Sequence, residues 1–278
     1  MSLRAFALDW KLDGPTGVLF LALVVAVGAL YLGAAAEGRR RDRRRRPWPR
    51  SRTACFLSGL TVLVLDLYSG IGSQADTWLS VHMVEHMVMW VVVAPLLAAG
   101  APVRLALYSL PRGGRCRLGR WLRSRPLASA TGPIGSVTVF CAVLVVTHVP
   151  AVYGLALSND YVHEAQHALY LLAALLVWAP LVGADPLPHR PSPRGQLGCV
   201  AACMVPMVLI AVWLATASSP VYSHYLHASG SAALADQRTA AGIMWVGGLP
   251  AFLVIALKRR RMPQRRRMQQ VRSHSAPA

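Results

Sequence analysis

Residues 77–99, TWLSVHMVEHMVMWVVVAPLLAA, form an apolar run that contains two histidines and a glutamate near its start. A hydrocarbon core about 30 Å thick is crossed by about 20 helical residues, so this run is long enough to span a membrane. Six other apolar runs have a comparable length. We therefore predict seven transmembrane helices, near residues 15–36, 54–71, 77–99, 132–153, 161–183, 197–218 and 239–257.

The composition agrees with an all-α polytopic membrane protein. The chain has 278 residues, of which 55% are hydrophobic and 14% are charged, yet its formal net charge is +18. A small number of charges that are mostly basic and clustered fits a membrane protein better than a soluble domain. We expect one seven-helix domain over residues 1–258, followed by a basic, disordered cytoplasmic tail at residues 259–278.

The basic residues predict the orientation of the bundle. Lysine and arginine accumulate in short cytoplasmic loops, and 26 of the 29 basic residues lie on one predicted side, at 39–52, 104–125, 190–194 and 258–272. The opposite side has Arg4, Lys11 and Arg238. The N-terminus is therefore expected outside and the C-terminus inside.

Two simpler interpretations fit the pattern less well. A basic run such as 39–46 can indicate nucleic-acid binding, but its place between apolar spans favours a topogenic loop. The small residues Ala34, Ala35 and Ala36 resemble a signal-peptide cleavage site. The dense positive charge directly after them instead favours retention of that end in the cytoplasm.

Two pairs of histidines lie at matched positions in the third and fifth predicted spans. Residues four apart share one helix face, so His82 projects with His86, and His163 projects with His167. Both spans run from outside to inside, which places these four imidazoles close to the outer surface. Three further histidines fall on the same side, namely His148, His224 and His227.

These histidine faces have the chemistry of a metal site. Imidazole binds copper, zinc and iron, and nearby carboxylates or carbonyls orient the rings, while thioethers suit cuprous ion. Ionisable groups cost about 2.5 to 3.5 kcal/mol each at the bilayer centre, so two matched pairs favour a functional site over polar packing at the interface. Candidate additional ligands or orienting groups are Asp66, Met83, Glu85, Met87, Glu164, Gln166, His148, His224, His227 and Asp236.

Two other functions remain open at this point. Histidine pairs on adjacent helices can hold haem iron in a membrane oxidoreductase, although the shallow position of both pairs leaves little room for a haem. A metal transporter would need a broken helix or a polar path through the inner half. The inner halves of the third and fifth spans contain Pro95 and Pro180 but no ionisable residue, and we expect these prolines to kink or end their helices.

Three stretches resemble signature regions of the CtaG family of cytochrome c oxidase assembly factors. They are HMVEHMVMWVVVAPLLAAGAPVRLAL at 82–107, HEAQHALYLLAALLVWAPLVGADPLP at 163–188 and LADQRTAAGIMWVGG at 234–248. The resemblance extends over nearly all of the chain after residue 50. It matches both histidine pairs and the family's DQ motif, here Asp236 and Gln237, while Glu85 stands where many members have glutamine.

The resemblance implies a role in maturing the copper-containing haem oxidase of the respiratory chain, in a bacterial cell membrane. The expected metal is copper, held at the outer face among His82, His86, His163 and His167. Expected partners are oxidase subunit I or other oxidase subunits, a copper donor on the outer side, and the lipid bilayer, with no nucleic acid. No catalytic residue is predicted, because delivery requires ligand exchange and no turnover.

Overall fold

The described part of the chain is a bundle of helices. The computed structural model describes residues 10, 14–41, 47–225 and 230–256, and these residues form helices and no strand. Six helical segments are long and apolar enough to cross a membrane, and a bent pair of helices makes up to seven. The prediction of an all-α bundle with several candidate membrane spans is confirmed, while the predicted tail at residues 259–278 lies outside the described residues.

The chain order of the helices follows the predicted spans. The first two spans are α2 (Gly14–Arg41) and α3 (Arg50–Tyr68), the latter followed by α4 (Gly70–Ala75). The third comprises α5 (Leu79–Val88), a π-helical turn (Met89–Val93), α6 (Ala94–Ala99) and α7 (Pro102–Ser109). Next come α8 (Arg112–Leu122), α9 (Arg125–Ala130), α10 (Pro133–Thr147) and α11 (Pro150–Ser158). The last elements are α12 (Asp160–Val182), α13 (Pro193–Thr216), a 3₁₀ turn (Ser223–Tyr225) and α14 (Gly230–Gly247), whose span continues to Ala256.

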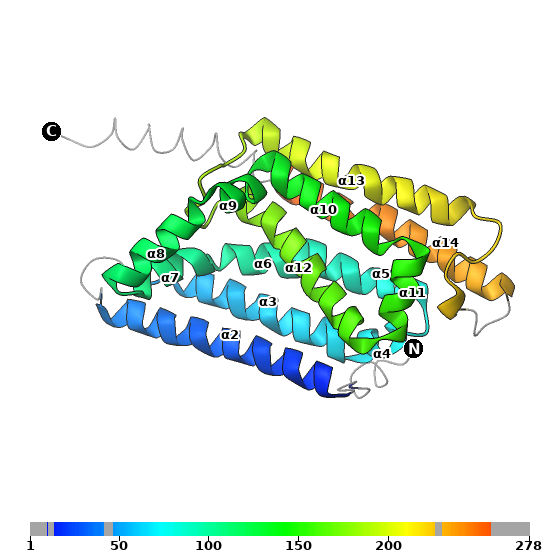
Figure 1. The fold of residues 1–278 in the computed structure, drawn as a ribbon, viewed down its shortest axis with the longest axis horizontal. Helices are drawn as coiled ribbons and strands as arrows, with labels where there is room; N and C mark the ends of the chain where they lie inside the picture. Colours follow the sequence, from blue (N-terminus) through cyan, green and yellow to red (C-terminus); the bar gives the residue numbers. More distant parts are fainter. Residues whose placement is uncertain (1–9, 11–13, 42–46, 226–229, 257–278) are drawn as a thin grey trace, which may run out of the picture.

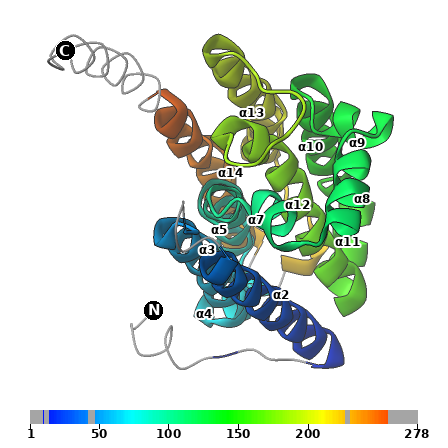
Figure 2. The ribbon, with the colours of Figure 1, turned by 90° about the vertical axis from the view of Figure 1, so that its left-hand side faces the viewer.

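The third span is central to the bundle. Figure 1 shows α4 and α11 at one end of the molecule and α7, α8 and α9 at the other. In the end view of Figure 2, α5 lies between α3 on one side and α12 and α14 on the other. Its side chains enter two separate apolar clusters, with Met83 and Trp90 in one and Met89 and Val93 in the other.

Pro95 explains how the side chains of the third span enter both apolar clusters. Pro95 has no N–H for the helical ladder, and the turn before it is widened, because the N–H of Ala94 donates to the carbonyl of Met89, five residues back. Such π-turns insert one extra residue into a helix. Met89 and Trp90 are consecutive in the chain, and both are buried, in different clusters.

The prediction that residues 132–153 form one continuous helix is wrong. The helix α10 ends at Thr147, α11 begins at Pro150, and the two axes differ by 75°. Pro150 cannot donate a backbone hydrogen bond, and it disfavours helical geometry at the preceding residue, where Val149 has a ψ of 126°. The break places His148 between the two helices, in the interior of the bundle.

Two other predicted boundaries also differ from the structure. The third span continues beyond residue 99 into α7, and it passes Gly100, where an added Cβ would lie 2.6 Å from the Cβ of Phe56. The last span begins at Gly230 and not at 239, so that Asp236 lies inside α14 and does not cap it. Apolar runs alone missed these extensions because the added residues are partly polar.

A carboxylate from a distant loop caps α7. Ala101 precedes this helix with a positive φ of 53°, and it has no polar side chain to accept the first N–H groups. Asp185, which follows α12, accepts a hydrogen bond from the backbone N–H of Arg104 at 2.7 Å. Burial raises the pKa of Asp185 above its ordinary value, in spite of the opposing effect of this hydrogen bond.

We predict that Asp185→Ala lowers the free energy of unfolding by about 1 kcal/mol, the usual cost of losing a helix cap. Asp185→Asn should cost less, because its amide oxygen can still accept the bond and the raised pKa shows that this site favours an uncharged side chain. Thermal unfolding of the detergent-purified protein measures both. Equal losses for Ala and Asn would contradict the capping role.

Candidate metal centre

The structure brings the two HxxxH pairs together. The α5 pair, His82 and His86, has its ring centroids 4.4 Å apart, and so does the α12 pair, His163 and His167. Across the two helices the centroids are 5.6 Å apart for His82 and His163, 5.7 Å for His86 and His167, and 6.4 Å for His82 and His167. Four imidazoles from two helices thus form one cluster, defined here as the histidine cluster.

The ring spacing of this cluster can be compared with that of a four-imidazole metal site. Four imidazoles bound tetrahedrally through bonds of about 2.0 to 2.1 Å have ring centroids roughly 5 Å apart, and the five centroid distances given above range from 4.4 to 6.4 Å. Among the described residues, one group of three potential ligands offers one ligand atom from each residue within 4.8 Å of the others, namely His82, Glu85 and His86. The α12 imidazoles face this group from the opposite helix.

Several buried nitrogens of the cluster have no hydrogen-bond partner. His82 is 1% exposed and His86 is 4% exposed. Within the described part of the chain, neither ring nitrogen of His82 has a hydrogen-bond partner, nor does Nε2 of His86. Buried polar atoms are nearly always paired, so these nitrogens are unusual, and their lone pairs are open to a ligand.

Two buried carboxyl groups accompany the imidazoles. Oε2 of Glu85 lies 3.4 Å from Nε2 of His167, which links α5 to α12. Asp66 on α3 is 1% exposed, and neither of its oxygens has a hydrogen-bond partner among the described residues. An uncompensated buried carboxylate is very costly, so this group requires either a proton or a nearby cation.

An acidic cavity of about 70 Å³ leads to the histidine cluster. Carboxylates that line a cavity raise the local concentration of cations. Two of the carboxylates, Asp76 and Asp160, were not among the sequence candidates, although each lies shortly before a histidine pair. The polar lining includes Asp76, Glu85, Asp160, His163, Glu164 and His167.

Sequence reasoning also missed three tyrosines beside the cluster. The ring of Tyr153 lies 5.4 Å from His82 and stacks on Tyr222 at 4.0 Å. Its hydroxyl lies 3.3 Å from that of Tyr225, and Tyr222 donates to the carbonyl of His148 at 3.1 Å. These tyrosines come from α11 and from the loop after α13, so no sequence spacing could have placed them together.

The other candidate residues occupy different places. Glu164 lines the acidic cavity, and Gln166 is buried on α12. His148 lies at the break between α10 and α11, whereas His224 packs edge-on against Tyr225, with ring centroids 5.4 Å apart. His227 lies outside the described residues.

A family model described as "Cytochrome c oxidase caa3 assembly factor" matches residues 29–260. The chain belongs to this family. Over 258 residues it is 30% identical to uncharacterised proteins of Mycobacterium bovis and Mycobacterium tuberculosis, and 26% identical to one of Mycobacterium leprae. Each alignment covers 88% of this chain but 38% of the relative, so the chain spans well under half the length of these proteins. No solved structure matches the chain.

The DQ pair of this family member ties α14 to the start of α5 and to the end of α13 with its following loop. Oδ2 of Asp236 accepts a hydrogen bond from the N–H of Ser80 in the first turn of α5, at 3.3 Å. The amide of Gln237 is buried; it accepts from the N–H of Val221 at 2.7 Å and donates to the carbonyl of Leu214 at 2.9 Å. Asp236 therefore caps the histidine-bearing helix, and Gln237 fixes the loop that carries the tyrosines.

We predict that Gln237→Leu lowers the free energy of unfolding by about 2 to 3 kcal/mol. The substitution leaves a backbone N–H and a backbone carbonyl without their partners, and each such loss costs about 1 to 3 kcal/mol. Thermal unfolding in detergent measures the effect, with the exposed neighbour Arg238→Gln as the control. A loss no larger than that of the control would contradict this role.

Proposed function

We propose that this protein assists the assembly of cytochrome c oxidase by holding copper in the histidine cluster and passing it to the oxidase. The family match supports the assembly role. The copper role is carried by one observation, the convergence of four histidines from two helices, of which His82 and His86 have buried ring nitrogens with no hydrogen-bond partner among the described residues. The proposed partners are oxidase subunit I or another oxidase subunit, and a copper donor on the outer side of a bacterial cell membrane.

Copper would reach the histidines through the acidic cavity. The carboxylates there attract the cation, and Asp66 and Glu85 offset its charge within the low-dielectric bundle. Release to a partner requires ligand exchange, for which Met83 and Met87 on the same helix supply weaker ligands. Only the bonds between copper and its ligands change, and no covalent bond of the protein is made or broken. The role therefore needs no catalytic residue.

The same cavities argue against a haem protein. Two cavities lined by cluster histidines in the described part of the chain have volumes of about 70 and about 10 Å³. Pockets for cofactors and drug-sized ligands are typically about 300 to 1,000 Å³. A single ion fits this space, whereas a haem would require the helices to separate.

The orientation with the N-terminus outside is part of this proposal. It follows from the 26 of 29 basic residues on one predicted side. The arginine-rich helix α8 lies at the opposite end of the bundle from α4 and α11 (Figure 1). In this orientation the histidine cluster opens toward the outer surface, where the copper sites of the oxidase would be loaded.

The copper content of the purified protein tests the function. After anaerobic loading and desalting, we expect about one copper per chain by mass spectrometry, and a large loss in both His82→Gln and His163→Gln, because one ion is shared by the two helices. His189→Gln, at an exposed site, is the matched control. Absence of copper from the wild-type protein, or co-purifying iron with haem absorbance, would overturn the proposal.

Cys116 tests the orientation. This native cysteine is exposed on α8, so a membrane-impermeant thiol reagent should label it only after the cells are permeabilised. Cys116→Ser provides the control for labelling at the other cysteines. Efficient labelling of Cys116 in intact cells would reverse the proposed orientation.

A further inference from the structure

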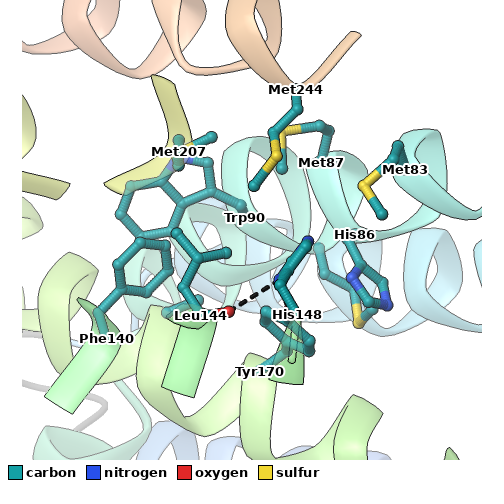
Figure 3. A pocket seen from close by; sticks show the side chains of 12 residues that line it. Met83, His86, Met87, Trp90, Phe140, Leu144, His148, Tyr170, Met207 and Met244 are labelled. Atoms are coloured by element: carbon teal, nitrogen blue, oxygen red, sulfur yellow. Dashed lines mark hydrogen bonds between the residues drawn. The ribbon is translucent and has the colours of Figure 1, made fainter. Parts of the chain in front are cut away.

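A second small cavity lies next to the histidine cluster, further along α5 and α12. Its volume is about 10 Å³, close to the minimum that one water molecule or a single ion requires. Five of the chain's nine methionines line it, and Figure 3 shows Met83, Met87 and Met244 on the side of His86, with Met207 beside Trp90. We call it the thioether cavity, and the methionines that line it are Met83, Met87, Met89, Met207 and Met244.

Two imidazole nitrogens are available in this cavity. Nδ1 of His148 lies 2.8 Å from the carbonyl of Leu144 and, because a carbonyl only accepts, Nδ1 carries the proton and Nε2 keeps its lone pair. Nε2 of His148 and Nε2 of His86 have no hydrogen-bond partner among the described residues. His148 is 3% exposed and His86 is 4% exposed.

The donor set selects the kind of ion. Thioethers and imidazoles are ligands for cuprous ion, whereas magnesium, calcium and manganese prefer carboxylate, carbonyl and water oxygens. None of the residues that line the thioether cavity has a carboxyl group. A buried site built from neutral ligands therefore favours a soft monovalent cation over a divalent one. The free-energy cost of burying an ion rises steeply with the charge of that ion.

His86 belongs to both sites. Its ring lies 4.4 Å from His82 and 5.7 Å from His167 in the histidine cluster, and it also lines the thioether cavity. An ion can therefore exchange its other ligands while it keeps His86, and so avoids passing through the apolar interior without ligands.

We propose that the thioether cavity is a second, cuprous site, and that Cu(I) moves into it from the histidine cluster by ligand exchange at His86. The copper stays Cu(I) throughout, so the step needs no electron donor or acceptor and changes only dative bonds. The inference rests on the proposed function, since the histidine cluster supplies the ion. This proposal also assigns a role to the helix break at His148, because the break turns the imidazole toward the sulfur ligands.

The packing of α14 makes room for one of these sulfurs. A Cβ added at Gly247 would lie 2.6 Å from Sδ of Met87. The same helix contributes Met244 to the cavity. The small residue thus lets α14 approach closely enough for two thioethers from different helices to face one cavity.

The experiment is X-ray absorption at the copper edge on the full chain, purified in detergent and loaded anaerobically with Cu(I). Wild-type protein should show both sulfur and nitrogen ligands. Met87→Leu/Met244→Leu should lose most of the sulfur signal and bind Cu(I) about tenfold more weakly or worse, a typical cost of disturbing a metal site. Leucine nearly conserves the volume of methionine, and Met204→Leu on α13, outside the cavity, is the matched control.

The outcomes separate this inference from the proposed function. Copper bound by nitrogen ligands alone in the wild type would overturn the thioether site and leave the histidine cluster intact, with the cavity holding at most water. Wild-type protein that retains no copper would overturn both. If the double variant does not fold, Met244→Leu is measured alone, and an unchanged sulfur signal there would count against the site.

Discussion

Ionisable groups that are buried in an apolar bundle must find partners, and this requirement applies where α5 faces α12. Glu85 and His167 meet at 3.4 Å between these helices, and an unpartnered buried charge there would be very costly. This contact favours the helix rotations that bring the two side chains together. Asp236 fixes the start of α5 from α14, so a third helix is tied to the same geometry.

The irregular backbone serves the same site. Pro95 widens a turn of the third span, and Pro150 breaks the fourth. In a membrane, such departures from the helical ladder are tolerated where they are buried in protein or line a cavity. Here the break is adjacent to His148, whose carbonyl accepts from Tyr222. This carbonyl has lost its backbone partner at the helix break, and the hydroxyl of Tyr222 therefore replaces that hydrogen bond.

The chemistry of the side chains changes along the bundle. Carboxylates line the acidic cavity, imidazoles form the neighbouring histidine cluster, and thioethers line the cavity beyond it. Oxygen ligands bind hard cations weakly and exchange quickly, while sulfur and nitrogen hold cuprous ion more firmly. Under the proposed function, a gradient of this kind favours movement of copper from the acidic cavity toward the thioethers and discriminates against magnesium and calcium.

The sequence by itself determined the helical class, the approximate spans and the pairing of His82 with His86 and of His163 with His167, because these depend on local periodicity and on the length of apolar runs. It could not determine the break at residue 148, although Pro150 was visible, because a proline within a span can kink a helix or end it, and only the surrounding packing decides between the two. The sequence also could not show that Asp236 bonds to the first turn of α5, or that Met244 and His148 line the same cavity. Those contacts join residues that are far apart in the chain, and they exist only because burial and hydrogen bonding across the bundle select one rotation for each helix.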